Sequence, residues 1–185
     1  DQVIISDLDE IPNLENINFK TIRNKLILFK QKMFYYKFNL ILDNMSWCGS
    51  KSCKKKDLLS PQWLREVKDK KYPIWRLDTL FSKKKYNDVF FVNNGGWHFT
   101  NIKTPEEIDK KLRSYLHHPE YEKSNIGPKE ISEMIIKKQP VYDLTANSSE
   151  SKDRSKSKLK ISNLNELPLY IQQNKEKFND WIINN

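Results

Sequence analysis

The first twelve residues place a short apolar run directly before a group of acidic side chains. The run Val3–Ile5 predicts a buried β-strand, and Pro12 ends the extended stretch soon afterwards. Asp7 and Asp9 stand two positions apart, so in extended geometry their carboxylates point to the same side. In an open α/β sheet, ligands bind at the carboxyl ends of strands. The stretch therefore predicts a hard oxygen site for Mg²⁺ or Mn²⁺, of the kind that shares its metal with a substrate diphosphate; a solvated acidic turn is the alternative.

The composition is that of a folded protein with a basic surface. The chain has 185 residues, of which 37% are hydrophobic and 12% aromatic. It contains no apolar run of about 18 residues, so we expect no transmembrane segment. The net charge of +9 attracts polyanions, which makes a nucleic-acid-binding module one alternative. That alternative is the weaker one, because the lysines are scattered over predicted loops and no nucleic-acid-binding motif accompanies them.

The remaining pattern alternates predicted strands with helices. Aromatic and aliphatic residues favour strands at Lys32–Leu42 and Asp88–Val92, with a loop over 43–56 between them. Serine and lysine make Ala146–Lys160 an expected mobile surface loop. Helix starts and apolar spacing predict four helices: Gln62–Lys68 with Ser60 as N-cap, one that starts with a capping box at Thr104 and ends near His117, Lys129–Lys138, and Pro168–Ile183.

A glycine pair follows the second predicted strand. Gly95 and Gly96 precede Trp97 and His98, and glycines permit a positive φ and a close approach of the backbone to a ligand. A phosphate or a sugar could lie against such a backbone, and a plain turn is the alternative. Trp97 suits stacking on a sugar face as well as it suits core packing.

Several pieces of the chain follow one another in a distinctive order. They are Asp7-Leu-Asp-Glu-Ile-Pro12, the aromatic strand Phe34–Asn39, Trp47-Cys48-Gly49, Gly95-Gly96-Trp97-His98-Phe99, the segment from Lys111 through His118 to Glu120, and the tail from Leu167 to Trp181. This order resembles glycosyltransferase family seventeen, whose best-known type is the β-1,4-mannosyl-glycoprotein 4-β-N-acetylglucosaminyltransferase. The resemblance covers nearly the whole chain, and its first and fourth pieces together are the most specific. Pro119, between His118 and Glu120, departs from the family pattern.

The resemblance implies an α/β fold of GT-A type and a metal-dependent inverting enzyme. Such an enzyme moves a sugar, N-acetylglucosamine in the family, from a UDP-sugar donor to a glycan acceptor. Asp7 and Asp9 match the metal-binding Asp-x-Asp element, and Mn²⁺ or Mg²⁺ is the implied ion. Gly95, Gly96 and the adjoining Trp97 match the loop expected at the donor, and His98 matches a histidine that contacts the metal or the phosphate. The implied location is cytoplasmic for a bacterial or viral member and the lumenal side of the Golgi membrane for a eukaryotic one.

The implied chemistry needs a cation and a base. The leaving diphosphate develops negative charge, which a divalent metal neutralises. Inversion requires one general base to deprotonate the acceptor hydroxyl. Glu120 is the first candidate for this base, with Glu10 and Asp78 as alternatives.

We expect the 185 residues to form a single partial glycosyltransferase domain, the C-terminal part of the whole. Only one short strand precedes Asp7, and the βαβ units of a nucleotide-binding half take about 30 residues each. The uridine pocket should then be missing, the first strand should lie at an uncovered sheet position, and the chain alone should bind UDP weakly. A catalytically silent carbohydrate-binding remnant is the further alternative.

Overall fold

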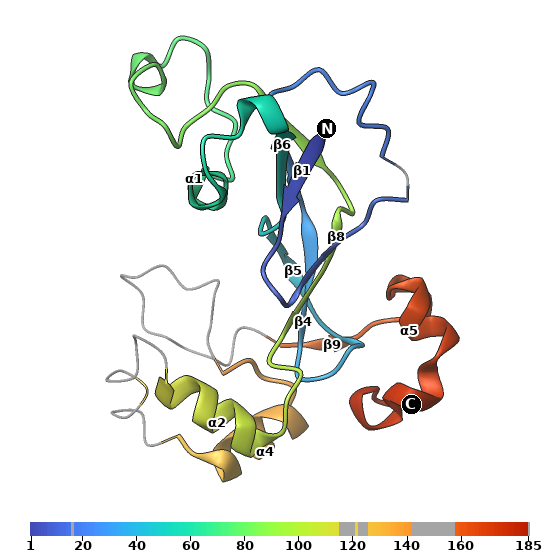
Figure 1. The fold of residues 1–185 in the computed structure, drawn as a ribbon. Helices are drawn as coiled ribbons and strands as arrows, with labels where there is room; N and C mark the ends of the chain where they lie inside the picture. Colours follow the sequence, from blue (N-terminus) through green and yellow to red (C-terminus); the bar gives the residue numbers. More distant parts are fainter. Residues whose placement is uncertain (16, 115–120, 122–125, 142–157, 185) are drawn as a thin grey trace. The chain divides into compact units, whose positions relative to one another are not determined.

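The structure is a computed structural model of the chain, and it describes residues 1–15, 17–114, 121, 126–141 and 158–184 (Figure 1). Contacts within the chain divide it into two compact units: unit 1 is Asp1–Lys32 with Ser46–His98, and unit 2 is Met33–Met45 with Phe99–Asn185. Both units contain strands and helices, so the protein is of mixed α/β class. None of the described helices is long and apolar enough to cross a bilayer. A single partial domain of GT-A type stays a prediction.

The main sheet of unit 1 has four strands in the order β1 (Gln2–Ile5), β6 (Lys51–Lys54), β3 (Leu26–Phe29) and β7 (Val89–Val92). β3 pairs in parallel with β7, whereas the other two pairings are antiparallel. All four residues of β3 are buried, as its continuous apolar run requires. The strands predicted at Val3–Ile5 and Asp88–Val92 are confirmed as β1 and β7, but the predicted burial of Val3–Ile5 is wrong. β1 lies at the edge of this sheet with its residues half-buried.

Helix α1 (Pro61–Glu66) covers part of this sheet. The Ser60 hydroxyl accepts a 3.0 Å hydrogen bond from the backbone N–H of Trp63, so the predicted N-cap is confirmed. The helix ends at Glu66, two residues before the predicted end, where Lys51 Nζ donates to the carbonyls of Arg65 (2.6 Å) and Val67 (2.5 Å). Its buried side chains join an apolar cluster: Leu26, Leu28, Cys53, Trp63, Leu64, Val67 and Val89.

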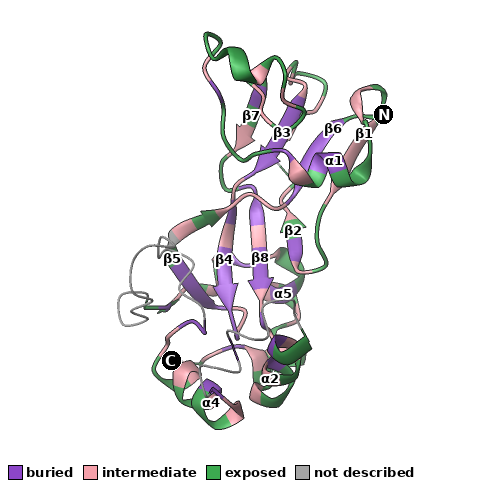
Figure 2. Cartoon of the chain, turned by 90° about the vertical axis from the view of Figure 1, so that its left-hand side faces the viewer, coloured by how far each residue is buried: buried purple, intermediate pink, exposed green. Residues whose placement is uncertain are grey.

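A second sheet has five strands in the order β2 (Glu10–Pro12), β8 (Gly96–Thr100), β4 (Gln31–Tyr35), β5 (Leu40–Trp47) and β9 (Lys160–Ile161). Buried residues are frequent on β3, β4 and β8, as Figure 2 shows in purple. The single strand predicted over Lys32–Leu42 is wrong, because a turn that includes Tyr36 at φ 61° separates two strands.

The loop predicted over 43–56 is also wrong. β5 continues to Trp47, and β6 follows after a short connection. The polar residues of this stretch are buried because each has a hydrogen-bond partner: Ser50 accepts from Gln31 Nε2 (2.9 Å), and the Ser52 hydroxyl donates to the carbonyl of Val3 (2.7 Å). A polar sequence therefore forms an interior strand here.

Unit 2 contains the helices α2 (Pro105–Ser114) and α4 (Pro128–Ile136), which pack against each other. The predicted capping box is confirmed: Thr104 N–H donates to Glu107 Oε2 (3.0 Å), and Glu107 N–H donates to Thr104 Oγ1 (3.3 Å). Ile108 is buried on the predicted face of α2. The other helix predicted in this region, Lys129–Lys138, corresponds to α4 with slightly shifted ends.

The C-terminal helix predicted over Pro168–Ile183 is wrong as a single element. It is divided into α5 (Leu169–Gln173) and the 3-10 helix η5 (Lys175–Trp181). Asn174, at φ −120° and ψ 31°, interrupts the helical backbone between them. Most of the loop expected over Ala146–Lys160 lies outside the described residues.

Candidate functional site

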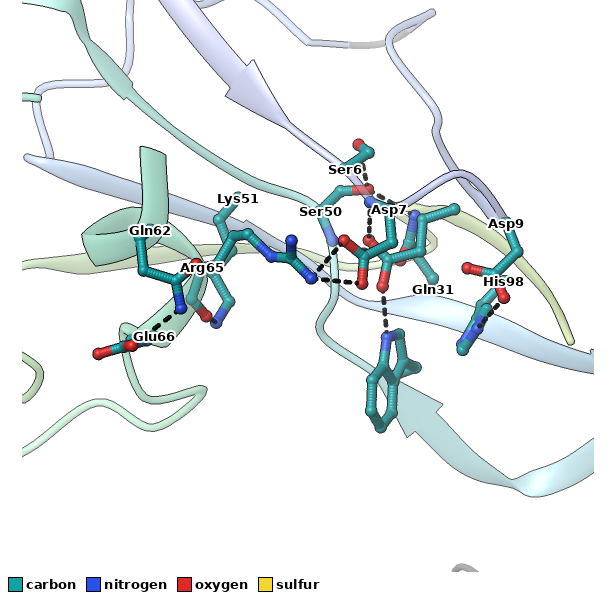
Figure 3. Close-up of polar contacts among 12 residues, drawn as sticks. Ser6, Asp7, Asp9, Gln31, Ser50, Lys51, Gln62, Arg65, Glu66 and His98 are labelled. Carbon is teal, nitrogen blue, oxygen red and sulfur yellow. Dashed lines mark hydrogen bonds and ion pairs between the residues drawn. The ribbon is translucent and has the colours of Figure 1, made fainter. Parts of the chain in front are cut away.

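The acidic residues after β1 lie in and beside a turn. The backbone N–H of Glu10 donates to the carbonyl of Asp7 (3.1 Å), which closes a β-turn with Leu8 and Asp9 at its tip. Figure 3 shows the Asp7 carboxylate directed to Arg65 and the Asp9 carboxylate directed to His98. The expectation that both carboxylates continue a strand and point to one side is therefore wrong, because the chain turns between them.

Glu10 holds this turn in place. Its side chain is 6% exposed, and its two oxygens accept hydrogen bonds from the Asp7 N–H (2.9 Å) and from Trp47 Nε1 (2.7 Å). Gly49 lies against the same carboxylate, and a Cβ at Gly49 would overlap it. Glu10 is thus a buried anchor that ties the turn to the segment Trp47–Gly49, and its role as general base stays a prediction.

Asp7 forms an ion pair with Arg65 of α1. Arg65 Nη2 lies 2.8 Å and 3.0 Å from the two carboxylate oxygens, and both side chains are about half exposed. They border a small pocket of about 130 Å³. Its polar lining consists of Ser6, Asp7, Glu10, Cys48, Lys51 and Arg65. The pocket combines carboxylates with two cationic side chains, which is the chemistry that a phosphate group and its counter-ion require.

Burial changes the ionisation of two groups in this pocket. Burial lowers the pKa of Lys51, although the neighbouring Asp69 opposes the effect. Burial, together with the charge of Asp69, raises the pKa of Cys48 to about 11. Cys48 therefore stays a neutral thiol near pH 7 and is a poor nucleophile.

The second half of the site is formed by Asp9 and His98. The antiparallel pairing of β2 with β8 sets Glu10 opposite His98, and Asp9 Oδ2 lies 3.4 Å from His98 Nε2. The Trp47 ring lies with its centroid 5.2 Å from that of His98. Within the described part of the chain, the buried Nδ1 of His98 has no hydrogen-bond partner. His98 is thus fixed by packing and presents Nε2 to Asp9.

The donor atoms of Asp9 and His98 fit a divalent cation. A carboxylate oxygen and an imidazole nitrogen converge, and both are ligands that Mn²⁺ accepts. The described residues contain no group of three or more His, Cys, Asp or Glu side chains that could hold a metal. The remaining ligands of an ion at Asp9 and His98 would come from water and a substrate diphosphate. Asp7 could join only by leaving Arg65.

The glycine pair contacts the backbone of neighbouring segments of unit 1. The Gly95 N–H donates to the carbonyl of Lys30 (2.7 Å), and its carbonyl accepts from the N–H of Asn13 (2.8 Å). Gly96 has a φ of +131°, and a Cβ there would overlap the carbonyl of Ile11 in β2. A positive φ is thus found at Gly96, and the backbone that it approaches closely is that of a protein strand. Contact of Gly95, Gly96 or the half-buried Trp97 with a donor stays a prediction.

The other two candidates for the general base are Asp78 and Glu120. Asp78 forms ion pairs with Arg76 (2.7 Å) and Lys85 (2.7 Å), and their hydrogen bonds hold its pKa at about 2. It does not line the pocket described above, and a carboxylate of such low pKa is a weak base. Glu120 lies outside the described residues.

Three functional candidates in the site were not predicted as such from the sequence. Arg65 and Lys51 resemble the other basic residues of a lysine-rich chain, so no sequence signal distinguishes them. Trp47 belongs to one of the family-like pieces, but its bond to Glu10 depends on the fold. Comparison of the chain with known protein families, with characterised proteins and with solved structures finds no match.

Proposed function

We propose that the protein is a metal-dependent inverting glycosyltransferase that moves N-acetylglucosamine from a UDP-sugar to a glycan acceptor. One observation carries the proposal. The family-like pieces around Glu10, Trp47 and His98 are far apart in the sequence but meet at one site of unit 1. Glu10 bonds to Trp47 and pairs with His98, and Gly49 packs on its carboxylate. Residues that match the pattern of an enzyme family and also lie together in the fold are typical of a functional site.

In this proposal Asp9 and His98 hold the cation, which neutralises the negative charge that develops on the departing diphosphate. Arg65 lies at the opposite side of the turn, where its Nη2, which now contacts both oxygens of Asp7, can donate to phosphate oxygens. Lys51 adds positive charge to the same pocket.

Glu120 remains the proposed general base for the acceptor hydroxyl. Asp78 is the poorest of the three candidates because its pKa of about 2 leaves it with little affinity for a proton. Glu10 already accepts a hydrogen bond at each oxygen, so proton uptake there would break the anchor of the turn.

The test is a screen of UDP-sugars with Mn²⁺, in which UDP release is measured with and without glycan acceptors. We expect UDP-N-acetylglucosamine to be the best donor and Asp9→Asn to lower turnover by roughly 10²-fold or more. Asp57→Asn, in the 3-10 helix η1 (Lys55–Asp57), is the control and should keep the wild-type rate. Full activity of Asp9→Asn would refute the proposal, and so would no turnover of any sugar nucleotide by a protein that also contains the expected nucleotide-binding half.

A further inference from the structure

A loop of unit 1, Pro73–Ser82, exposes an unusual number of large apolar side chains. We call it the apolar loop. Five of its ten residues are large hydrophobic side chains between 71% and 90% exposed: Ile74, Trp75, Leu77, Leu80 and Phe81. In Figure 2 the cartoon of the loops beside β3 and β7 is largely green, the colour of exposed residues. Isolated exposed apolar residues are common on proteins, but five such side chains within positions 74–81 are typical of an interaction site.

The apolar loop is a defined structure. Its two flanks are joined at the base, where Lys68 N–H donates to the carbonyl of Lys84 (2.8 Å) and Tyr72 N–H donates to the carbonyl of Tyr86 (3.0 Å). Successive turns, including the 3-10 helix η2 (Leu77–Thr79), use the backbone groups inside the loop. The apolar side chains are therefore held outward by a backbone that satisfies its own hydrogen bonds.

The polarity of the loop is inverted. Its charged side chains bond to one another: Asp78 accepts from Arg76 (2.7 Å) and from Lys85 (2.7 Å). The Arg76 guanidinium also lies 5.3 Å from the centroid of the buried Tyr72 ring. The charged side chains of the loop thus pair with one another and with Lys85 at its base, whereas its large apolar side chains are left exposed to solvent. Exposure of these apolar side chains to water is unfavourable, whereas their transfer into an apolar medium is favourable.

The surroundings of the loop are strongly basic. The segment from Lys68 to Lys85 contains seven basic and two acidic residues. Five of its lysines are exposed around the base of the loop: Lys68, Lys70, Lys71, Lys83 and Lys84. Exposed Trp and Phe with a rim of lysines match the interface of an anionic bilayer, where the rings lie at the headgroups and lysines pair with lipid phosphates.

We propose that the apolar loop docks the protein onto the surface of a membrane that contains anionic lipids. Trp75 and Phe81 insert at the headgroup level, and the surrounding lysines supply the electrostatic attraction. The docking is peripheral, since it uses a loop and no spanning helix. It is independent of the proposed sugar transfer, because none of the loop residues lines the pocket at Asp7 and Arg65.

The experiment measures binding of the protein to vesicles by flotation at an ionic strength of about 0.1 M. Vesicles of phosphatidylcholine alone are compared with vesicles that also contain phosphatidylserine. We expect binding to the anionic vesicles, and a decrease of at least roughly tenfold for Trp75→Ala/Phe81→Ala. The control Ile136→Ala/Leu169→Ala removes two exposed apolar side chains elsewhere in the chain and should leave binding unchanged. Brominated lipid should quench the tryptophan fluorescence of the wild type more strongly than that of Trp75→Phe.

Three results would overturn the proposal. The first is a wild type that does not float with anionic vesicles. The second is a Trp75→Ala/Phe81→Ala variant that binds as well as the wild type, because binding would then be adsorption by lysines, which nucleic acid would give equally. The third is a Trp75-dependent dimer in light scattering without vesicle binding, because the apolar loop would then pair two copies of the chain. Circular dichroism of the exposed-site variants verifies that each is folded.

Discussion

The hydrogen bond between Trp47 and Glu10 should make a measurable contribution to the stability of unit 1. Trp47→Phe keeps an aromatic ring beside His98 but removes the Nε1–H that donates 2.7 Å to Glu10 Oε1. Glu10 is 6% exposed, so its oxygen would lose its partner away from bulk water. Hydrogen bonds to charged groups contribute about 1.5–3 kcal/mol, and we expect Trp47→Phe to cost about 2 kcal/mol.

Urea unfolding followed by far-ultraviolet circular dichroism measures this cost as a shift of the midpoint at unchanged slope. Trp75→Phe is the matched control, because the Trp75 indole is exposed, and its cost should stay within about 0.5 kcal/mol. A double-mutant cycle with Glu10→Gln should give a coupling of about 1 kcal/mol or more, since both changes act on one bond. If Trp47→Phe unfolds at the same urea concentration as Trp75→Phe, the assignment of Glu10 as the anchor of the turn is incorrect.

Three further predictions concern other parts of the chain. Because the pKa of Cys48 is about 11 against an ordinary 9.0, a thiol reagent at pH 8 should label Cys48 roughly 100-fold more slowly than an exposed thiol, and the labelling rate should rise with pH. Asp69→Asn should increase the labelling rate, and a wild-type rate equal to that of an exposed thiol would contradict the burial of Cys48. Thr104→Ala should destabilise unit 2 by about 1 kcal/mol in urea through loss of the capping box of α2, whereas Thr104→Ser should not, and equal effects would exclude the cap. Arg65→Ala should tighten Mn²⁺ binding in calorimetry, because Asp7 is released from its ion pair; an unchanged Mn²⁺ affinity would remove Arg65 from the site.

Local signals in the sequence predicted local structure well. The hydroxyl of Ser60 and the Thr104 capping box mark helix starts because the bonds that they form lie within four residues. The strands β1 and β7 were predicted for the same reason, since a short apolar run favours a strand without distant information; the half-burial of β1 follows from its place at the sheet edge. The mixed α/β class follows from this alternation.

Longer-range structure was harder to predict. β6 is polar in sequence, and only its partners in β1, β3 and α1 make its burial possible. The break at Asn174 leaves no strong mark, because the apolar residues on both sides keep helical spacing.

The candidate site shows the same limit. Asp7, Asp9 and His98 could be selected from residue types, but the turn that separates the two carboxylates depends on Glu10 and its bond to Trp47. Arg65 reaches Asp7 from a helix 58 positions along the chain, a pairing that no spacing rule contains.

Titration of the protein with Mn²⁺, followed by electron paramagnetic resonance of the free ion, tests the central claim most directly. We expect the wild type to bind Mn²⁺ and both Asp9→Asn and His98→Gln to weaken binding by at least roughly tenfold, since each removes one of two converging ligands. Asp78→Asn removes a carboxylate outside the pocket and should leave the affinity unchanged. Wild-type affinity in the Asp9→Asn variant, or an equal loss in Asp78→Asn, would contradict a metal site at the turn after β1.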